Sequence, residues 1–345
     1  MLALTLLLLA PAVTTWGHTD DGRAVDRVTL SNRQGMRVSL MDYGAAMVSL
    51  EVPDRDGHAD NIVLGFADFA GYAHSQGRYA AVIGRYAGRI DRAGFDLDGQ
   101  AVRLIPGRSG VTLHGGPDSY DHRLWSHRLV RGKAYSGVEF RLVSPDGDQG
   151  FPGRLALTVT YRLDRDRNRL RIVYSATTDA PTVVNLTNHG FYNLSGAGTS
   201  GMARHTFQIF AGSYAEVDDR KVPTGRLLPV DGTPLDFRVP TALAEGVAYD
   251  HSLVLDGMDG LHLAAVIRDG ASGREMHVLT TEPSVQFNDG GVAKDAAPGH
   301  RGDGFALETQ HLPDSPHHPD FPSTVLRPGQ RFRSETDLVF GVARR

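Results

Sequence analysis

The sequence predicts an all-β protein, built as a sandwich or a barrel of short strands. Apolar residues alternate with polar ones along many short segments, which is the spacing of strands with one buried face. Turn-forming residues separate these segments, and the 40 glycines are spread among them instead of forming a linker. Helical spacing is confined to two expected single turns, Asp68–His74 and Thr241–Glu245, which disfavours a parallel βαβ architecture.

The strands can be placed in order along the chain. Residues 28–30 and 36–40 form the first pair, joined by a turn at residues 32–35. A strand over residues 47–52 follows and ends at Pro53. The same alternation returns at residues 138–142, 155–163, 170–174, 207–209, 276–278 and 332–340.

The composition excludes several classes of function. The chain holds 36 basic and 40 acidic residues without a basic run, so no nucleic-acid partner is expected. It has no cysteine, which rules out disulfides, thiol catalysis and cysteine-ligated metals. No linker or repeat divides the sequence, and we expect a single domain over residues 25–343.

The first residues have the pattern of an export signal. Leu2–Val13 is an apolar run of signal-peptide length, too short for stable insertion into a membrane. Ala10-Pro11-Ala12 is an A-x-A-type cleavage signal, although no Lys or Arg precedes the run. We expect residues 1–12 to be a signal peptide and the protein to be periplasmic or secreted, with a cytoplasmic location as the alternative.

One segment concentrates polar side chains inside an apolar setting. Residues 185–194 hold three asparagines, a threonine, a histidine and a tyrosine, directly after the strand-like residues 182–184. A buried polar atom without a partner costs about 1–3 kcal/mol, so such a segment requires a reason. We expect a functional site centred on His189.

Four other segments carry the same mixture of groups. Arg89 lies in G-R-Y-A-G-R-I, His114 in L-H-G-G, Asp250 in Y-D-H and Glu308 in the apolar strand F-A-L-E-T-Q. Each alone could be structural, as a histidine bonded into the core or a carboxylate paired with an arginine. Together, a carboxylate, two histidines, an aspartate and an arginine form a set that can move protons.

These motifs occur in an order that resembles the aldose 1-epimerase (galactose mutarotase) family. To them are added N-L-T-N-H-G-F-Y-N-L, P-S-V-Q-F around Gln286, and a tail from Leu312-Pro313-Asp314 to Leu326-Arg327-Pro328-Gly329. The resemblance implies a large antiparallel β-sandwich with a sugar cleft. It also implies interconversion of the α and β anomers of free aldoses, such as galactose and glucose, without a metal or organic cofactor.

The resemblance implies a role for each motif residue. Glu308 would be the general base and His189 the general acid, and His114 would lie near the ring oxygen. Sugar hydroxyls would be bound by Asp250, Arg89 and Gln286. A free histidine titrates near about 6.5 and a free glutamate near about 4.3, so we expect only modest tuning to keep His189 charged and Glu308 ionised. An aldose is the expected partner of a chain that is a monomer or a dimer.

Three single positions and one tripeptide depart from the family pattern. Gly88 and Val111 stand where asparagine is usual, and Ser252 replaces another asparagine. Gly190-Phe191-Tyr192 changes the residue order after the histidine. The acid–base pair is kept, whereas the lost polar groups leave the preferred aldose open.

Two alternative functions suit the same fold, a sugar-phosphate epimerase and a carbohydrate-binding protein without activity. A phosphate would require additional Arg or Lys around the cleft, and only Arg85 and Arg89 gather at a motif. A protein that only binds sugar has no need of a Glu and a His suited to proton transfer.

Three further patterns are interpreted as chance matches. Residues 196–201 fit G-x-G-x-x-G but precede a strand, where a dinucleotide site requires a helix. Asn185 and Asn193 head glycosylation-like triplets at the expected site. Zinc-ligand spacing is missing at His311, His317 and His318.

Overall fold

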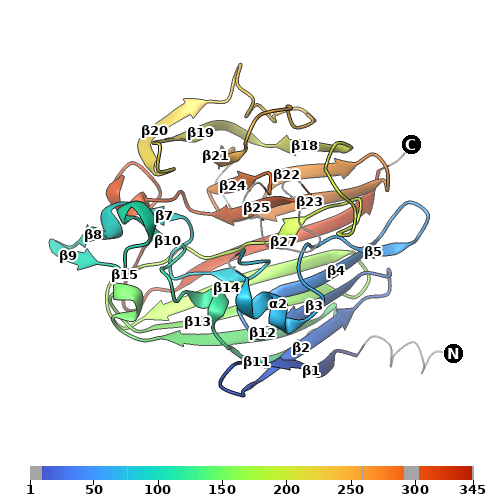
Figure 1. Cartoon of the computed structure of the whole chain (residues 1–345), viewed down its shortest axis with the longest axis horizontal. Helices are drawn as coiled ribbons and strands as arrows, with labels where there is room; N and C mark the ends of the chain where they lie inside the picture. The colour runs from blue at the N-terminus through green and yellow to red at the C-terminus, as the bar shows by residue number, and fades with distance from the viewer. Residues whose placement is uncertain (1–9, 76, 258–259, 291–302, 344–345) are drawn as a thin grey trace.

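The computed structural model describes residues 10–75, 77–257, 260–290 and 303–343, and antiparallel sheets make up most of it (Figure 1). The five-stranded sheet contains, in spatial order, β1 (Ala12–His18), β2 (Ala24–Ser31), β3 (Arg37–Met41), β4 (Met47–Pro53) and β5 (Ala59–Asn61). The eight-stranded sheet contains β11 (Ser126–Arg131), β12 (Tyr135–Ser144), β13 (Leu155–Asp164), β14 (Arg169–Thr178), β27 (Phe332–Val342), β23 (Arg274–Thr280), β22 (His262–Asp269) and β18 (His205–Ile209). The six-stranded sheet contains β17 (Phe191–Tyr192), β25 (Phe305–Gln310), β24 (Ser284–Asn288), β21 (Asp250–Leu255), β19 (Ala211–Val217) and β20 (Pro223–Pro229).

Short strand pairs and turns connect these sheets. The pairs are β6 (Val82–Ile83) with β16 (Thr187–Asn188), β7 (Arg89–Ile90) with β10 (Thr112–Leu113), β8 (Gly94–Leu97) with β9 (Gln100–Arg103), and β15 (Thr182–Val183) with β26 (Val325–Leu326). The helical turns are α2 (Phe69–His74), η1 (Asp91–Ala93), η2 (Arg108–Gly110), η3 (Tyr120–His122), η4 (Asp148–Gly150) and η5 (Ser315–His317).

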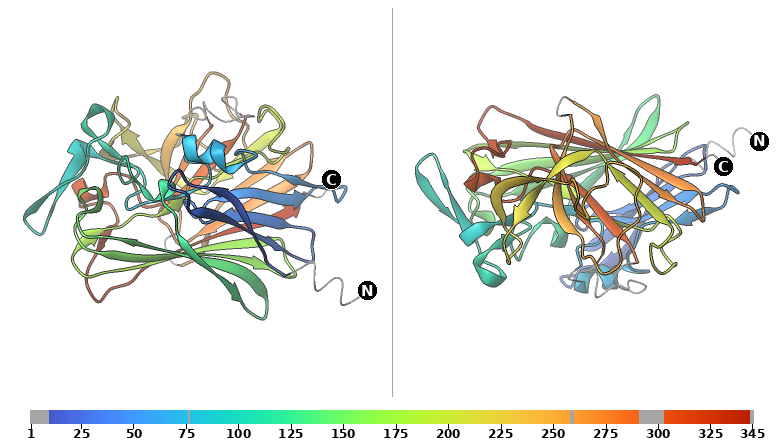
Figure 2. Two further views of the ribbon diagram at one scale, coloured as in Figure 1. Left: turned by 60° about the horizontal axis from the view of Figure 1, so that its bottom comes forward. Right: turned by 90° about the horizontal axis from the view of Figure 1, so that it is seen from above.

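The core lies between the eight-stranded sheet and the other two, which Figure 2 shows from two directions. One buried apolar cluster draws side chains from each sheet, including Leu40 of β3, Phe140 of β12 and Phe287 of β24. Along β13 every second residue from Leu155 to Leu163 is buried, as the alternation predicts. The expected all-β antiparallel sandwich is therefore confirmed.

The two expected helical turns have different outcomes. The first is confirmed as α2, where the Asp68 carboxylate accepts a hydrogen bond from the Gly71 N–H at 3.0 Å and caps the helix. The second, at Thr241–Glu245, is wrong. Thr241 exchanges two backbone hydrogen bonds with Phe207 of β18, at 2.8 and 2.9 Å, and this pairing replaces the local helical turn.

The two chance-match interpretations that concern glycine and asparagine agree with the structure. Residues 196–201 form a loop that leads into β18, without a helix. Asn185 and Asn193 are fully buried, and their side-chain amides donate to backbone carbonyls, as Asn193 does to Thr199 at 3.0 Å. Both asparagines are therefore structural groups that hold the surrounding loops.

The expected leader falls mainly on residues 1–9, which lie outside the described residues. Ala12, the last residue of the cleavage-like signal, is also the first residue of β1 and pairs with Thr29 of β2. Export of the chain stays a prediction. The described ranges contain no helix that is both long and apolar enough to cross a membrane.

Arg85 belongs to the core and not to a ligand cleft. Its side chain is 2% exposed, and its guanidinium donates to the carbonyls of Pro152 and Gly153, at 2.7 and 2.8 Å, and to the Ser144 hydroxyl at 2.6 Å. A planar group with five N–H donors can serve several carbonyls at once. Arg85 thus ties the segment before β7 to both ends of the β12–β13 connection.

Replacing this arginine by methionine is expected to destabilise the fold. Arg85→Met leaves buried acceptors unpaired, so the free energy of unfolding should fall by about 2–4 kcal/mol. Urea unfolding followed by tryptophan fluorescence measures the change. The matched control is Arg131→Met, at an exposed strand end, which should change it by less than about 0.5 kcal/mol. Equal stability of the two variants would contradict the assignment.

Candidate active site

The open face of the six-stranded sheet carries three of the expected site residues. Side chains alternate along a strand, so β24 buries Val285 and Phe287 in the core and turns Gln286 to the other face. The strand register then aligns Ser252 of β21, Gln286 of β24 and Glu308 of β25 in one row across the sheet. Asp250 is two residues before Ser252 on β21, and therefore on the same face.

His189 faces this row from the segment between β16 and β17. Its backbone is fixed by two hydrogen bonds, from its N–H to the Ala81 carbonyl at 3.0 Å and from the Ala80 N–H to its own carbonyl at 2.9 Å. Its Nε2 lies 3.6 Å from Glu308 Oε1. The imidazole packs between the rings of His114 and Phe191, with centroids at 5.3 and 5.1 Å, which sets its orientation.

The L-H-G-G segment holds His114 in a turn that requires its glycines. His114, Gly115 and Gly116 have φ values of 53°, 86° and 107°. A Cβ on Gly115 would lie 2.2 Å from the Gly84 carbonyl oxygen, so only glycine fits there. The Gly88 N–H donates to His114 Nδ1 at 3.1 Å. Because Nδ1 accepts, the neutral ring carries its proton on Nε2, where it can donate to a ligand.

Asp250 and Gln286 form a connected polar chain with Ser252. The Gln286 amide N–H donates to Asp250 Oδ1 at 2.6 Å, and the Ser252 hydroxyl donates to Gln286 Oε1. This second bond fixes which end of the amide faces Asp250. Ser252, where the family usually has asparagine, therefore orients a residue that we expect to bind sugar.

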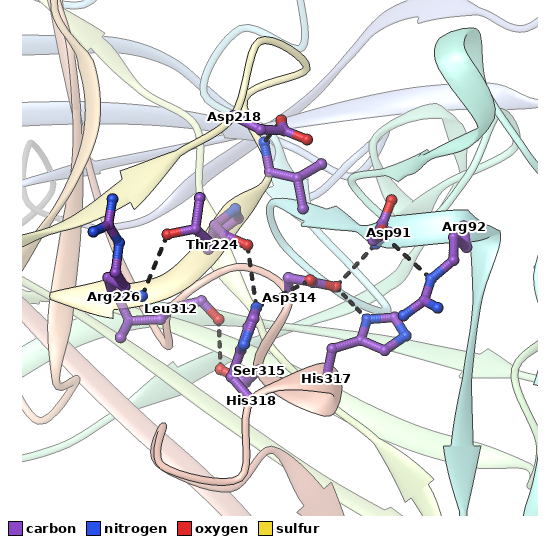
Figure 3. Close-up of polar contacts among 12 residues, drawn as sticks. Asp91, Arg92, Asp218, Thr224, Arg226, Leu312, Asp314, Ser315, His317 and His318 are labelled. Atoms are coloured by element: carbon purple, nitrogen blue, oxygen red, sulfur yellow. Dashed lines mark hydrogen bonds and ion pairs between the residues drawn. The ribbon is translucent and has the colours of Figure 1, made fainter.

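Arg89 is held in place by the chain's C-terminal tail. The Asp314 N–H donates to the Arg89 carbonyl at 2.8 Å, and Asp314 Oδ1 accepts from the Asp91 N–H at 2.9 Å. The same carboxylate contacts the imidazole nitrogens of His317 and His318, at 2.6 and 3.3 Å (Figure 3). Asp314 thus joins η5 to the segment that presents Arg89.

Gly88, the departure next to Arg89, permits a close contact with this tail. Its φ is +82°, and a Cβ on it would lie 2.7 Å from the Pro313 ring. A second departure, Val111, is not among the residues that line the cavity of His189 and Glu308, and it borders a neighbouring cavity instead.

All six expected residues line one cavity of about 260 Å³. They are His189, Glu308, His114, Asp250, Arg89 and Gln286. The structure adds Arg78, Asn288 and Gln310, which sequence reasoning missed. Asn288 and Gln310 lie on the strands of Gln286 and Glu308 at alternate positions, so strand periodicity could have found them.

Arg78 had a weaker sequence signal. The tetrapeptide G-R-Y-A occurs twice, at residues 77–80 and again seven positions later at residues 84–87. The arginine of the first copy, Arg78, lines the cleft, whereas the arginine of the second copy, Arg85, is buried in the core. Arg78 donates to the Ser119 hydroxyl at 2.6 Å and to the buried Asp121 carboxylate at 3.0 Å. The backbones of these identical tetrapeptides differ, since φ is positive, at +54°, at Arg78 and not at Arg85.

Burial changes the charges that the sequence suggested for the acid–base pair. His189 and Glu308 are 8% and 3% exposed. Burial, followed by the Arg78 charge, lowers the pKa of His189 to about 4. Burial, followed by the Asp250 charge, raises the pKa of Glu308 to about 8, against the opposing pull of Arg89 and Arg78. The expectation of modest tuning was wrong, because a low-dielectric site disfavours each charged form.

The site can also be tested as a metal centre. Ligand atoms of His114, His189 and Glu308 all lie within 4.8 Å of one another. A metal-bound histidine normally donates its second N–H to an acceptor. His114 does the reverse, since its Nδ1 accepts from the Gly88 N–H, and its remaining nitrogen then carries a proton. This set is better suited to hydrogen bonding and proton transfer than to metal binding.

Comparison with known proteins agrees with the fold and with the order of the motifs. The family model described as Aldose 1-epimerase matches residues 26–338. Human galactose mutarotase is 38% identical over 320 residues, which cover 89% of this chain and 92% of the human protein. Aldose 1-epimerase of Escherichia coli K12 is 38% identical over 338 residues, or 93% and 96% of the two chains. The crystal structure of an aldose epimerase homologue from Caenorhabditis elegans superposes with a TM-score of 0.86 at 29% identity, covering 93% of this chain and 100% of that one.

The antiparallel sandwich and its polar cleft define a sugar isomerase that interconverts the anomers of aldoses. The chain belongs to the aldose 1-epimerase family.

Asp314 is expected to act by positioning Arg89. Asp314→Ala removes the acceptor of the Asp91 N–H and should raise KM for an aldose about three- to tenfold, the value of a lost hydrogen bond or slightly more, with little change in kcat. Asp314→Asn should restore most of the loss, because its amide oxygen still accepts and asparagine tolerates the +58° φ found there. Polarimetry over a range of sugar concentrations separates the two constants. A fall in kcat at constant KM would contradict a positioning role.

Proposed function

We propose that Glu308 and His189 exchange protons with the sugar during anomer interconversion, with Glu308 as base and His189 as acid. The observation that carries this proposal is their position, 3.6 Å apart on two neighbouring segments that line a cavity large enough for one sugar ring. Glu308 Oε2 and His189 Nδ1 have no hydrogen-bond partner among the described residues. A bound sugar can supply such partners.

The reaction follows from moving one proton through the sugar. Glu308 removes the proton of the C1 hydroxyl, and His189 gives one to the ring oxygen, so the C1–O5 bond breaks and the open-chain aldehyde forms. The C1–C2 bond rotates, and the ring closes on the other face of the aldehyde with the two roles exchanged. Each positioned proton transfer contributes typically about 10²–10⁴-fold.

The pKa shifts match this exchange. Neutral His189 with protonated Glu308 holds the same number of protons as charged His189 with ionised Glu308. The first arrangement is favoured by burial and belongs to the open-chain aldehyde, while the second belongs to the ring form about to open. The pair therefore passes between the two states without a change in its net charge.

The other cleft residues are proposed to recognise the sugar. His114 Nε2–H would donate near the ring oxygen, and hydroxyls would be held by Asp250, Arg89 and Gln286. Carboxylate, guanidinium and amide groups supply acceptors and donors in fixed geometry, which suits several hydroxyls. Galactose and glucose are the proposed substrates, and relatives named galactose mutarotase support the first of them. The expected monomer or dimer stays a prediction.

Removing either proton-transfer group should abolish most turnover without unfolding the protein. Glu308→Gln and His189→Asn are each expected to lower kcat for galactose by about 10²–10⁴-fold. Polarimetry of freshly dissolved α-galactose measures the rate, and circular dichroism checks the fold. The matched control is Glu245→Gln, an exposed carboxylate, which should keep full activity. Normal turnover by either site variant would refute the roles, and a wild type that binds galactose without accelerating its mutarotation would favour the carbohydrate-binding alternative.

The dependence of kcat/KM on pH should show the range in which Glu308 and His189 together hold one transferable proton. Below about pH 4 both groups are protonated and no base remains, and above about pH 8 both are deprotonated and no acid remains. We expect kcat/KM to be level between these limits and to fall about tenfold per pH unit beyond them. The rates must be corrected for uncatalysed mutarotation at each pH. A decline that begins near about 6.5, the ordinary value for histidine, would contradict the shifts.

A further inference from the structure

A second cavity of about 420 Å³ lies next to the aldose cleft. The two cavities share Arg78, Arg89 and Leu113 as lining residues. We call the second one the arginine cleft, because its lining includes four arginines from four separate segments. They are Arg78, Arg89, Arg108 and Arg220. No carboxylate belongs to its lining among the described residues.

Two of these arginines have their charges balanced from outside the cleft. Arg220 contacts the carboxylates of Asp91 and Asp218, at 2.8 and 2.9 Å. The two aspartates are labelled in Figure 3, on separate segments near the Asp314 cluster. Arg78 is paired with Asp121 at 3.0 Å. These pairs hold the guanidinium groups in place at the wall of the cleft.

The other two arginines have no such partner. Neither Arg89 nor Arg108 forms an ion pair or a side-chain hydrogen bond within the part of the chain that the structure describes. Arg108 is exposed and lies in η2, and Arg89 is partly buried at the boundary between the two cavities. The arginine cleft therefore has an excess of positive charge, whereas the aldose cleft contains the carboxyl groups of Asp250 and Glu308.

We propose that the arginine cleft is an anion subsite, which binds an oxyanion carried by the aldose while Glu308 and His189 contact the sugar ring. This inference rests on the proposed function and adds a substrate class to it, namely aldoses with a carboxylate or a phosphate group. Guanidinium groups bind both oxyanions through paired, charge-assisted hydrogen bonds. Arg89 borders both cavities, so one residue can contact the ring and the oxyanion together.

The structure also shows more arginines around the cleft than the sequence suggested for binding a phosphate. The sequence suggested only Arg85 and Arg89, and Arg85 is enclosed in the core. Folding instead brings Arg78, Arg108 and Arg220 to the cleft from segments that are distant in the chain. Anomer interconversion is unchanged by this subsite, because the oxyanion takes no part in the bond that breaks and forms between C1 and O5.

The experiment compares one neutral and two anionic sugars. The kcat/KM values for galactose, galacturonate and galactose 6-phosphate are measured by polarimetry at low and high ionic strength, for the wild type and for Arg108→Gln. In the wild type, at least one anionic sugar should match or exceed galactose, and salt should lower kcat/KM for that sugar alone. Arg108→Gln should lower kcat/KM about three- to tenfold for the anionic sugar and less than about twofold for galactose. The sugar with the larger loss identifies the oxyanion as carboxylate or phosphate.

Controls keep this test separate from that of the proposed function. Arg131→Gln, an exposed arginine at the end of β11, should change none of the values. Galactose turnover alone tests the proposed function, and calorimetric binding of the three sugars tests the subsite even without turnover. The subsite is overturned if Arg108→Gln affects all three sugars equally, if Arg131→Gln has the same effect, or if lactose, a neutral disaccharide, shows the same dependence on Arg108.

Discussion

The structure depends on burying a carboxyl group and an imidazole side by side in a site of low dielectric. Water would keep Glu308 and His189 in their ordinary charge states, and burial reverses both preferences. The cost of an isolated buried charge is high, so a site of this kind is stable only if its net charge stays constant. One proton shared by two groups meets that condition, and it is also what ring opening and closure require.

The sandwich supplies the rigidity that this pair needs. Glu308 lies on β25, between β17 and β24, and is in register with Gln286 of β24. His189 is tied to the Ala80–Ala81 segment and packed between two rings. The open face of the six-stranded sheet then needs only short loops to close the cleft. The six-stranded sheet positions Glu308, Asp250 and Gln286, the short strand β7 positions Arg89, and the glycine turn after β10 positions His114.

Much of this arrangement could be predicted from the sequence, and the failures have identifiable causes. Alternation gave the strands because it reports which face is buried, and ordered motifs indicated the six site residues that the cavity brings together. Arg78 was missed because its position depends on a left-handed backbone and on a distant aspartate. The pKa values of Glu308 and His189 were misjudged because burial is a property of the assembled sheets. Thr241 joined a β-bridge through a partner 34 positions earlier, Phe207, which local spacing does not reveal.

The bond from Ser252 to Gln286 has a consequence for how the cleft could diverge among relatives. A hydroxyl can turn to donate or accept, whereas the longer asparagine amide presents both functions in a fixed plane. A change at this one position, which does not line the cavity, would therefore be transmitted through the glutamine and could exchange an N–H for a carbonyl at the sugar. With Gln286 in its proposed role at a sugar hydroxyl, this position would tune selectivity among epimeric hexoses from behind the binding surface and leave the proposed proton-transfer groups unchanged.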